Sequence, residues 1–420
     1  MFNKFSSHLT LIAFGSILGV FNSQTPATAA FFTGVGDLPG GGFSSAATSV
    51  SADGSIVGGI SFSEAGPDGE AFLWTAETGL MGLGDLPGGD FLSGVFGVSD
   101  DGLAAAGASF SAESALSMPP LQSFHWTAET GLVPLGDLPG GTFSSFTLSI
   151  SGDGRVVVGD SDSASGREAF RWSAETGMVG LGDFEGGDFD STVVSASFDG
   201  SVIVGTGTNS IGKMALRWTE EAGLSELGDL PGGEIFSTAA SVSNDGLVVA
   251  GRSSSANSSA SGLPVTLASG TEAFRWTAEM GMIGLGDLAG GNFFSTATAI
   301  SGDGSIIVGQ SEGAFGEEPF IWDSLNGMRS LTEVLTNDFD LELGSWTNLT
   351  ATEISSDGST IVGLGLNPDG NLEGWIAGLD SQPVPVPEPR STGGTLVLLG
   401  LIGMRLFKPR FQEQKIKTIS

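Results

Sequence analysis

The sequence predicts an all-β fold, a seven-bladed β-propeller with four-stranded blades. Three observations predict it. The element Ser-x-Asp-Gly recurs seven times before an apolar run, a Trp follows each copy, and a Gly-rich string typified by GLGDLPGG (82–89) occurs six times. Such periods, close to 50 residues and made of strand-like segments, are typical of propellers and other repeat arrays. The repeated acids and tryptophans are Asp53, Asp101, Asp153, Asp199, Asp245, Asp303 and Asp357, and Trp74, Trp126, Trp172, Trp218, Trp276, Trp322 and Trp375.

Composition is consistent with a large folded body. The 420 residues include 68 Gly, 28 Phe and 8 Trp, which supply ample apolar surface for a core. The absence of Cys excludes disulfides, thiolate metal sites and cysteine nucleophiles. Residues 30–389 contain 8 Lys or Arg and 47 Asp or Glu, a formal charge of −39. That charge argues against a nucleic-acid partner, because the phosphate backbone must be neutralised by basic side chains.

The first two strands of a unit are predicted around an Asp-Gly turn. The inner strand is FFSTATAIS (293–301), whose small and β-branched residues suit a place beside a narrow axis. Asp303-Gly304 predicts a type I′ hairpin turn, since that geometry requires positive φ at both central residues. The second strand is SIIVGQS (305–311), an apolar run typical of a strand covered on both faces.

The third and outer strands complete the unit. In EAFRWTA (272–278), Phe274 and Trp276 alternate with other residues, so both rings lie on one face of the third strand. A short turn leads to the outer strand GMIGLGDL (281–288). The Leu-Pro-Gly-Gly of most copies predicts a type II turn, with positive φ at the Gly after Pro. The repeated string is therefore predicted to end the outer strand and cross to the next blade.

The two ends of the repeat region complement one another. The seventh unit has strands at 346–355, 359–366 and 373–379 but no string of its own. The N-terminus carries a lone outer strand with its string, FFTGVGDLPGG (31–41). Joining the two fragments completes the seventh blade and closes the ring, so that every sheet is covered on both faces. The alternative is a right-handed β-solenoid, in which complementary terminal fragments have no explanation.

Residues 1–30 predict a secretory signal peptide. They hold a basic residue, an apolar stretch from about Leu9 to Phe21, and the small residues Ala27-Thr28-Ala29. The apolar stretch is shorter than the roughly 20 residues that span a membrane. We expect cleavage between Ala29 and Ala30, so that the domain at 31–380 folds outside the cytoplasm.

The C-terminus combines a Pro-rich linker at 381–390 with an apolar helix and basic tail at 391–420. Basic residues after the apolar stretch should hold that end in the cytoplasm. Pro387-Glu388-Pro389, the short helix and the basic cluster together resemble the PEP-CTERM sorting signal. The resemblance implies that an exosortase cleaves near Pro387, Glu388 and Pro389 and frees the protein for the cell surface or exterior. The chain would then contact the membrane only transiently, through 391–410.

The repeat itself carries a second resemblance. The pattern A-F-R-W-T-A-E-x-G-M-x-x-L-G-D-L-P-G-G is similar to the HAF repeat of probable extracellular proteins, and SFHW (123–126) keeps its His. The resemblance to the HAF repeat covers essentially all of 31–380. It implies an extracellular location and a repeat architecture, but no chemical activity. After Met328 the sequence departs from the pattern, so the sixth outer strand is in doubt there and one helical turn is expected as an alternative.

Candidate chemical residues are few. His125 is the only His after the signal peptide, and the Leu, Arg or Ile found there in other units indicates a structural position. One His without Cys excludes His-based metal sites and Ser-His-Asp catalysis. Recurring acids would suit calcium, yet no EF-hand-like loop occurs and a turn explains each, so no metal site or cofactor is predicted. These acids are Asp53, Asp153, Asp303, Asp85, Asp137 and Asp287. Arg171, Arg217 and Arg275 are interpreted as inter-blade ion pairs, with a ligand-contacting ring as the alternative.

The sequence favours a non-enzymatic, secreted structural or binding scaffold at the cell envelope or exopolysaccharide matrix. Expected partners are the secretion signal peptidase, the exosortase and extracellular polysaccharide. The alternatives are a secreted hydrolase with a carboxylate pair and a calcium-dependent adhesion module. Two Ser-rich insertions, 111–122 and 253–271, join second and third strands and are candidate partner-binding or glycosylation loops.

Overall fold

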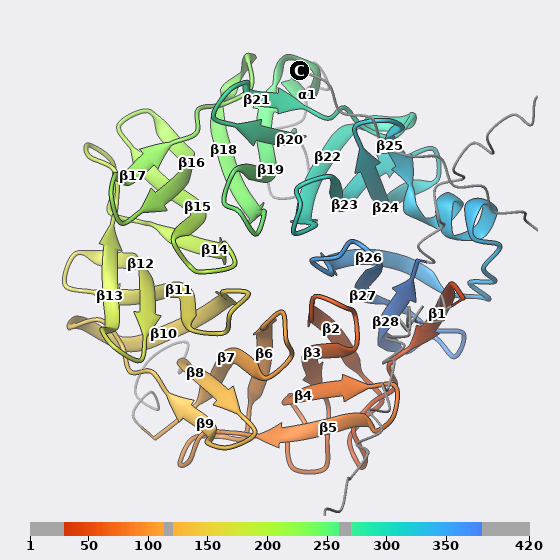
Figure 1. Cartoon of the computed structure of the whole chain (residues 1–420), viewed down its shortest axis with the longest axis horizontal. Helices are drawn as coiled ribbons and strands as arrows, with labels where there is room; N and C mark the ends of the chain where they lie inside the picture. The colour runs from red at the N-terminus through yellow and green to blue at the C-terminus, as the bar shows by residue number, and fades with distance from the viewer. Residues whose placement is uncertain (1–28, 113–120, 260–269, 380–420) are drawn as a thin grey trace, which may run out of the picture. The chain divides into compact units, whose positions relative to one another are not determined.

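The computed structural model describes residues 29–112, 121–259 and 270–379. In this part of the chain, 28 strands form seven four-stranded antiparallel sheets, arranged as blades around an axis (Figure 1). The predicted seven-bladed β-propeller is confirmed and the solenoid alternative is wrong. The chain divides into two units, 1–380 and 381–420, and the second lies wholly outside the described residues. None of the helices in the described ranges has the length and apolar character needed to cross a membrane.

Each blade begins with an inner strand beside the axis, followed by a second strand. The inner strands of blades 1 to 7 are β2 (Ser45–Val50), β6 (Ser93–Val98), β10 (Gly140–Ile150), β14 (Thr192–Ala196), β18 (Gly232–Val242), β22 (Gly290–Ile300) and β26 (Thr347–Ile354). The second strands are β3 (Ile56–Ser61), β7 (Ala104–Phe110), β11 (Val156–Ser163), β15 (Val202–Asn209), β19 (Val248–Ser255), β23 (Ile306–Gly313) and β27 (Thr360–Leu366).

A third strand and an outer strand complete each blade. The third strands are β4 (Glu70–Thr75), β8 (Leu121–Thr127), β12 (Gly166–Ser173), β16 (Gly212–Thr219), β20 (Glu272–Thr277), β24 (Gly316–Asp323) and β28 (Leu372–Gly378). The outer strands are β5 (Gly79–Gly84), β9 (Gly131–Pro134), β13 (Gly177–Gly182), β17 (Gly223–Glu226), β21 (Gly281–Gly284), β25 (Gly327–Ser330) and, for blade 7, β1 (Phe31–Gly34).

The core lies between adjacent blades. Val204 of β15 in blade 4 and Phe274 of β20 in blade 5 are both fully buried and belong to one cluster of apolar side chains. The Phe274 ring lies on Gly251 of β19, where an added Cβ would come within 2.8 Å of the ring and 2.2 Å of a backbone oxygen. Large aromatic residues on the third strand therefore require Gly on the second strand.

The repeated Gly-rich string is a joint between blades, and the predicted outer strand (281–288) was too long. The strand ends at Gly284. The Leu285 and Gly286 N–H groups still bond within blade 5, and from the Gly286 carbonyl onward the joint bonds to the following blade. The Ser295 hydroxyl donates to the Gly286 carbonyl (2.5 Å) and accepts from the Ala273 N–H (2.9 Å). Leu288 is buried, and its N–H donates to the Ser311 hydroxyl (2.9 Å). The predicted positive φ follows in all six copies, at Gly40, Gly88, Gly140, Gly186, Gly232 and Gly290.

The Asp-Gly turns differ from the prediction of type I′. Gly304 has φ 71°, but Asp303 is not among the non-Gly residues with positive φ in the described part of the chain. Ser301 and Ile306 instead flank a four-residue loop, in which the Asp303 carboxylate accepts from the Ser301 hydroxyl (2.8 Å) and the Ser305 N–H (2.9 Å). These side-chain hydrogen bonds hold Asp at negative φ, so a two-residue turn does not form.

The ring closes as predicted. β1 pairs antiparallel with β28, with Phe31 opposite Gly378 and Gly34 opposite Trp375 (Figure 1). The N-terminal segment is therefore the outer strand of the last blade.

The seventh tryptophan is not equivalent to the other six. Trp375 lies opposite Gly363, the place that Phe72 takes opposite Gly59 in blade 1. It is fully buried, whereas the other six tryptophans are half-buried. The regular alternation of Asp-Gly and Trp in the sequence hides this shift, because it is two residues long and keeps the same face.

The sixth blade has its outer strand despite the altered sequence after Met328. β25 is present, and it leads into a short helix, α2 (Leu331–Glu333), and a π-helix at Val334–Asp338. Leu331, Val334 and Leu335 are buried against blades 6 and 7. The expected helical turn therefore follows the outer strand without replacing it.

Candidate functional site

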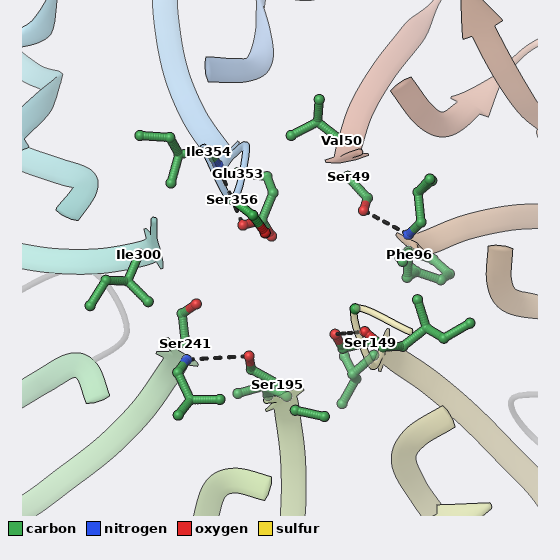
Figure 2. Close-up of a pocket in the computed structure, with 18 of the residues that line it drawn as sticks. Ser49, Val50, Phe96, Ser149, Ser195, Ser241, Ile300, Glu353, Ile354 and Ser356 are labelled. Carbon is green, nitrogen blue, oxygen red and sulfur yellow. Dashed lines mark hydrogen bonds between the residues drawn. The ribbon is translucent and has the colours of Figure 1, made fainter. Parts of the chain in front are cut away.

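Residues at one equivalent position of the seven inner strands lie around the axis, next to a small cavity. These residues are Ser49, Gly97, Ser149, Ser195, Ser241, Ala299 and Glu353, and all but Ala299 line the cavity (Figure 2). The cavity volume is about 90 Å³, room for several water molecules. Six blades place a small residue at this position, and only blade 7 places a carboxyl group there.

A closed circle of backbone hydrogen bonds joins the Asp-Gly turns around the axis. The N–H of Ala52 in blade 1 donates to Asp100 of blade 2 (3.0 Å), and the circle returns to blade 1 when the Asp357 N–H donates to the Ala52 carbonyl (3.1 Å). Seven such bonds of 2.8 to 3.1 Å connect successive blades. The four-residue turns are long enough to place these groups at the axis.

Asp100 joins three blades at the axis. Its carboxylate accepts from the Asn244 side-chain amide of blade 5 (3.0 Å) and from the Ser356 hydroxyl of blade 7 (2.9 Å). An added Cβ on Gly152 would come within 3.0 Å of the Asp100 carboxylate, and one on Gly302 within 2.8 Å of the Asn244 amide. Small residues in the neighbouring turns leave room for this cluster.

Glu353 is half-buried and lines the cavity. Burial and, more weakly, the negative charge of Asp100 raise the pKa of Glu353 to about 8. The carboxyl group is therefore mainly protonated at neutral pH. No residue that lines the cavity is Lys, Arg or His, so the protein supplies no counter-charge there.

This cavity does not suit an organic substrate. Ligand pockets typically measure about 300–1,000 Å³, well above the 90 Å³ found here. Asp100 and Glu353 are a pair of acids that sequence reasoning did not single out. The space beside them holds water or an ion but not a sugar ring, so the pair gives no support to the carboxylate-pair hydrolase.

Two of the larger grooves lie at one end of the ring, which we call the Asp–Gly face because the Asp-Gly turns lie there. One groove of about 390 Å³ is lined by Arg275, Met280 and Trp322 of blades 5 and 6. Another of about 920 Å³ runs over blade 3 between Trp172 and Trp218, with Arg155 and Glu175 at its margin. Both contain a half-buried Trp beside charged turn residues.

His125 has a structural position, as the sequence indicated. Its Nε2 lies 3.1 Å from the Gly154 carbonyl of the next blade, and its ring lies against Trp172 with centroids 5.6 Å apart. Burial lowers the pKa of His125, so the ring is neutral at pH 7 and its Nε2–H donates to the carbonyl.

The predicted inter-blade ion pairs of the third-strand arginines are wrong. No salt bridge in the described ranges involves Arg171, Arg217 or Arg275. Arg217 instead donates to the Gly246 carbonyl of the next blade (3.3 Å), as His125 does to the Gly154 carbonyl. Burial lowers the pKa of Arg217. Arg171 and Arg275 line the two grooves, as the alternative interpretation requires.

The repeated acids form no cluster that could hold a metal ion. Within the described ranges no group of three or more His, Asp or Glu has a suitable arrangement. The acids of the Asp-Gly turns, Asp53, Asp153 and Asp303, accept bonds within their own turns. Asp85 and Asp287 have a raised pKa through burial and a nearby Glu, and Asp137 belongs to the equivalent joint.

The sequence-predicted processing sites are only partly described. Ala29 and Ala30 precede β1 and form no strand. Pro387, Glu388 and Pro389, the signal segment before Ala29 and the tail lie outside the described residues. Most of the two insertions lies outside as well, but the described start of the second is not a solvated loop. Ser253 and Ser254 extend β19 and are buried, and a short helix, α1 (Ala256–Ser259), follows.

Sequence reasoning missed Asp100 and Glu353, although a signal was present. Superposing the seven Ser-x-Asp-Gly elements puts Glu353 at a position that is Ser, Gly or Ala elsewhere. The same superposition puts an acid at Asp100 that no other unit has. When repeats are nearly identical, a residue that differs from its equivalents in all other repeats indicates a position with a role in one blade alone.

The solved structures compared with this chain are distant, at 10–15% identity. No protein-family model and no curated protein matches the chain. Among solved structures, TolB from Acinetobacter baumannii is 12% identical with a TM-score of 0.41, over 65% of this chain and less than two thirds (62%) of that one. Oligogalacturonate lyase from Vibrio parahaemolyticus is 13% identical, with a TM-score of 0.48 over 79% and 88% of the two chains. The β-propeller domain of the Trilobed protease from Pyrococcus furiosus is 10% identical, with a TM-score of 0.44 over 84% and 94%. At these distances the similarities carry no argument about activity.

Proposed function

We propose that this chain is an exported extracellular protein that serves as a non-enzymatic binding scaffold at the cell envelope or in the exopolysaccharide matrix. The observation that carries the proposal is a Trp repeated in six blades near the Asp–Gly face, where two grooves have similar linings. Six blades place a half-buried Trp there, and charged side chains line the grooves at Trp172, Trp218 and Trp322. A repeated surface of this kind suits a polymer with a repeating structure.

The groove chemistry favours polysaccharide as the partner. The apolar C–H face of a sugar ring packs on the flat face of an indole, which buries apolar area at little conformational cost. Guanidinium and carboxylate groups at the margin, such as Arg155 and Glu175, are suited to pairs of hydroxyl groups. The formal charge of −39 over residues 30–389 disfavours polyanionic chains, so the proposed partner is a neutral glycan.

The route to the exterior is part of the same proposal. Signal peptidase cleaves between Ala29 and Ala30, and exosortase cleaves near Pro387, Glu388 and Pro389. The support is the pair of terminal signals in the sequence, which flank a body without Cys and with a strong negative charge.

Two measurements test the proposal. Intact mass of protein from the medium or envelope should correspond to a chain from near Ala30 to near Pro389, and a species retaining 391–420 at the outer surface would contradict exosortase release. Co-sedimentation with exopolysaccharide from the source cells should weaken about tenfold in Trp172→Ala and Trp218→Ala. Phe315→Ala is the control, since this fully exposed side chain lies outside the grooves. Equal binding by all variants would exclude the grooves.

A further inference from the structure

The axial cavity contains two acids and no counter-charge. Asp100 belongs to the turn of blade 2, and Glu353 to the inner strand of blade 7. Both side chains line the same cavity of about 90 Å³. None of the 21 residues that line the cavity is basic. Acids placed together in an enclosed space are costly unless a cation or a proton neutralises them.

A third polar group points to a ligand independently of the acids. Ser241 of blade 5 is 93% buried, with a relative exposure of 7%, and its hydroxyl points into the cavity (Figure 2). That hydroxyl makes no hydrogen bond to any other described residue, whereas Ser49 and Ser195 at equivalent positions accept backbone N–H groups. A buried hydroxyl facing a polar cavity without a protein partner is satisfied by water or by an ion.

We propose that the axial cavity is a calcium site, with the carboxylates of Glu353 and Asp100 and the hydroxyl of Ser241 as oxygen donors from the protein. Calcium accepts carboxylate, hydroxyl, carbonyl and water oxygens in flexible numbers, so water can complete a site with few protein ligands. Magnesium requires a stricter octahedral arrangement and loses water reluctantly, so it suits this cavity less well. The cavity has room for an ion with a few waters, but not for an organic ligand.

The site lies where calcium would join blades. Glu353, Asp100 and Ser241 come from blades 7, 2 and 5, so one ion would contact three parts of the ring that are far apart in sequence. Calcium binding would therefore stabilise the closed ring. The acids of the Asp-Gly pairs, such as Asp53 and Asp153, would have no part in this, because they do not line the cavity.

The test uses the purified chain, stripped of metal by a chelator and titrated with calcium chloride in a calorimeter. We expect one saturable site with a dissociation constant of roughly 0.1–1 mM, the range of extracellular calcium modules. At 10 mM calcium the melting temperature should rise by roughly 1–5 °C. Magnesium chloride at equal concentration controls for charge screening, and an equal response to it would overturn the proposal.

Matched variants locate the site. Glu353→Ser places in blade 7 the residue that blades 1, 3, 4 and 5 already have, so it should fold and lose the saturable site. Glu353→Gln, of nearly equal volume, is the second variant, and Ser241→Ala should weaken binding several-fold. Glu279→Ser removes an exposed acid and should leave binding unchanged. A calcium response in both Glu353 variants equal to that of the wild type would mean surface binding only. Absence of any saturable site in the wild type would mean that the cavity holds water only.

Discussion

The side-chain amide of Asn244 in blade 5 donates a hydrogen bond of 3.0 Å across the axis to the carboxylate of Asp100 in blade 2, 144 residues away in the sequence. Together with the Ser356 hydroxyl of blade 7, this bond joins blades that share no strand pairing. The contact depends on the closed ring, because only closure brings these turns together.

Removing this contact should destabilise the ring. Asn244→Ala removes one of the two donors to the Asp100 carboxylate, and Asp100→Ala leaves the half-buried Asn244 amide without its acceptor. We expect a loss of about 1–3 kcal/mol in the free energy of unfolding. A double-mutant cycle in calcium-free buffer, measured by chemical denaturation, should give a coupling energy of roughly 0.5–3 kcal/mol. Asn292→Ala, at an exposed asparagine, is the control and should change stability by less than about 0.5 kcal/mol. Additive effects of the two axial substitutions would contradict the contact.

Deleting residues 31–40 should lower the melting temperature markedly. The deletion removes β1 and leaves the edge of β28 unpaired in blade 7. It also removes the buried side chains of Val35 and Leu38 from the cluster between blades 7 and 1. Calorimetry of the truncated and complete proteins measures the effect, and unchanged melting would contradict closure.

A pair of cysteines tests the same closure from the opposite direction. Thr33 of β1 lies opposite Ile376 of β28, and the chain has no Cys of its own to interfere. Thr33→Cys with Ile376→Cys should form a disulfide under oxidation and raise stability by roughly 2–4 kcal/mol over the reduced form. Thr33→Cys alone is the control, and two free thiols in the oxidised double variant would contradict the register.

Stability in calcium-free solution should fall as pH rises. The folded protein holds Glu353 protonated up to a pKa of about 8, whereas the unfolded chain releases this proton near its ordinary pKa of 4.5. Between these values the folded state binds the extra proton, so the free energy of unfolding decreases by up to roughly 1.4 kcal/mol per pH unit. Urea denaturation at several pH values should show this slope in the wild type, and a smaller slope in Glu353→Gln. Identical slopes would mean that Glu353 titrates normally.

Removing one serine of a joint should cost more than removing a surface serine. Ser295→Ala deletes the bond to the Gly286 carbonyl and leaves the buried Ala273 N–H without its acceptor. We expect a loss of about 1–3 kcal/mol in the free energy of unfolding, measured by denaturant titration. Ser324→Ala, at an exposed serine of blade 6, should be nearly neutral. Equal effects would mean that the joint does not depend on this hydroxyl.

Much of the fold could be read from the sequence because the information is local and repeated. Alternation of Phe274 and Trp276 identified the third strands, and positive φ at the Gly after Pro identified the crossing. The lone outer strand at 31–41 and the three-stranded unit at 346–379 complement one another, which predicted that the ring is closed. The turn type at Asp303 was predicted wrongly, because hydrogen bonds from its side chain determine the backbone conformation there. The different place of Trp375 was missed, because a shift of two residues leaves the alternation along the strand unchanged.

The sequence by itself determined the strands, the number of blades and the joints between them, since each depends on residues within one repeat of about 50. Only the tertiary structure decided what the axis contains. Superposing the repeats marks Asp100 and Glu353 as deviating residues, but nothing local indicates that they share one cavity with Ser241. The physical reason is curvature. Once seven sheets close into a ring, the inner strands face the same small volume, so Glu353 of blade 7 shares a cavity with Asp100 and Ser241, each two blades away.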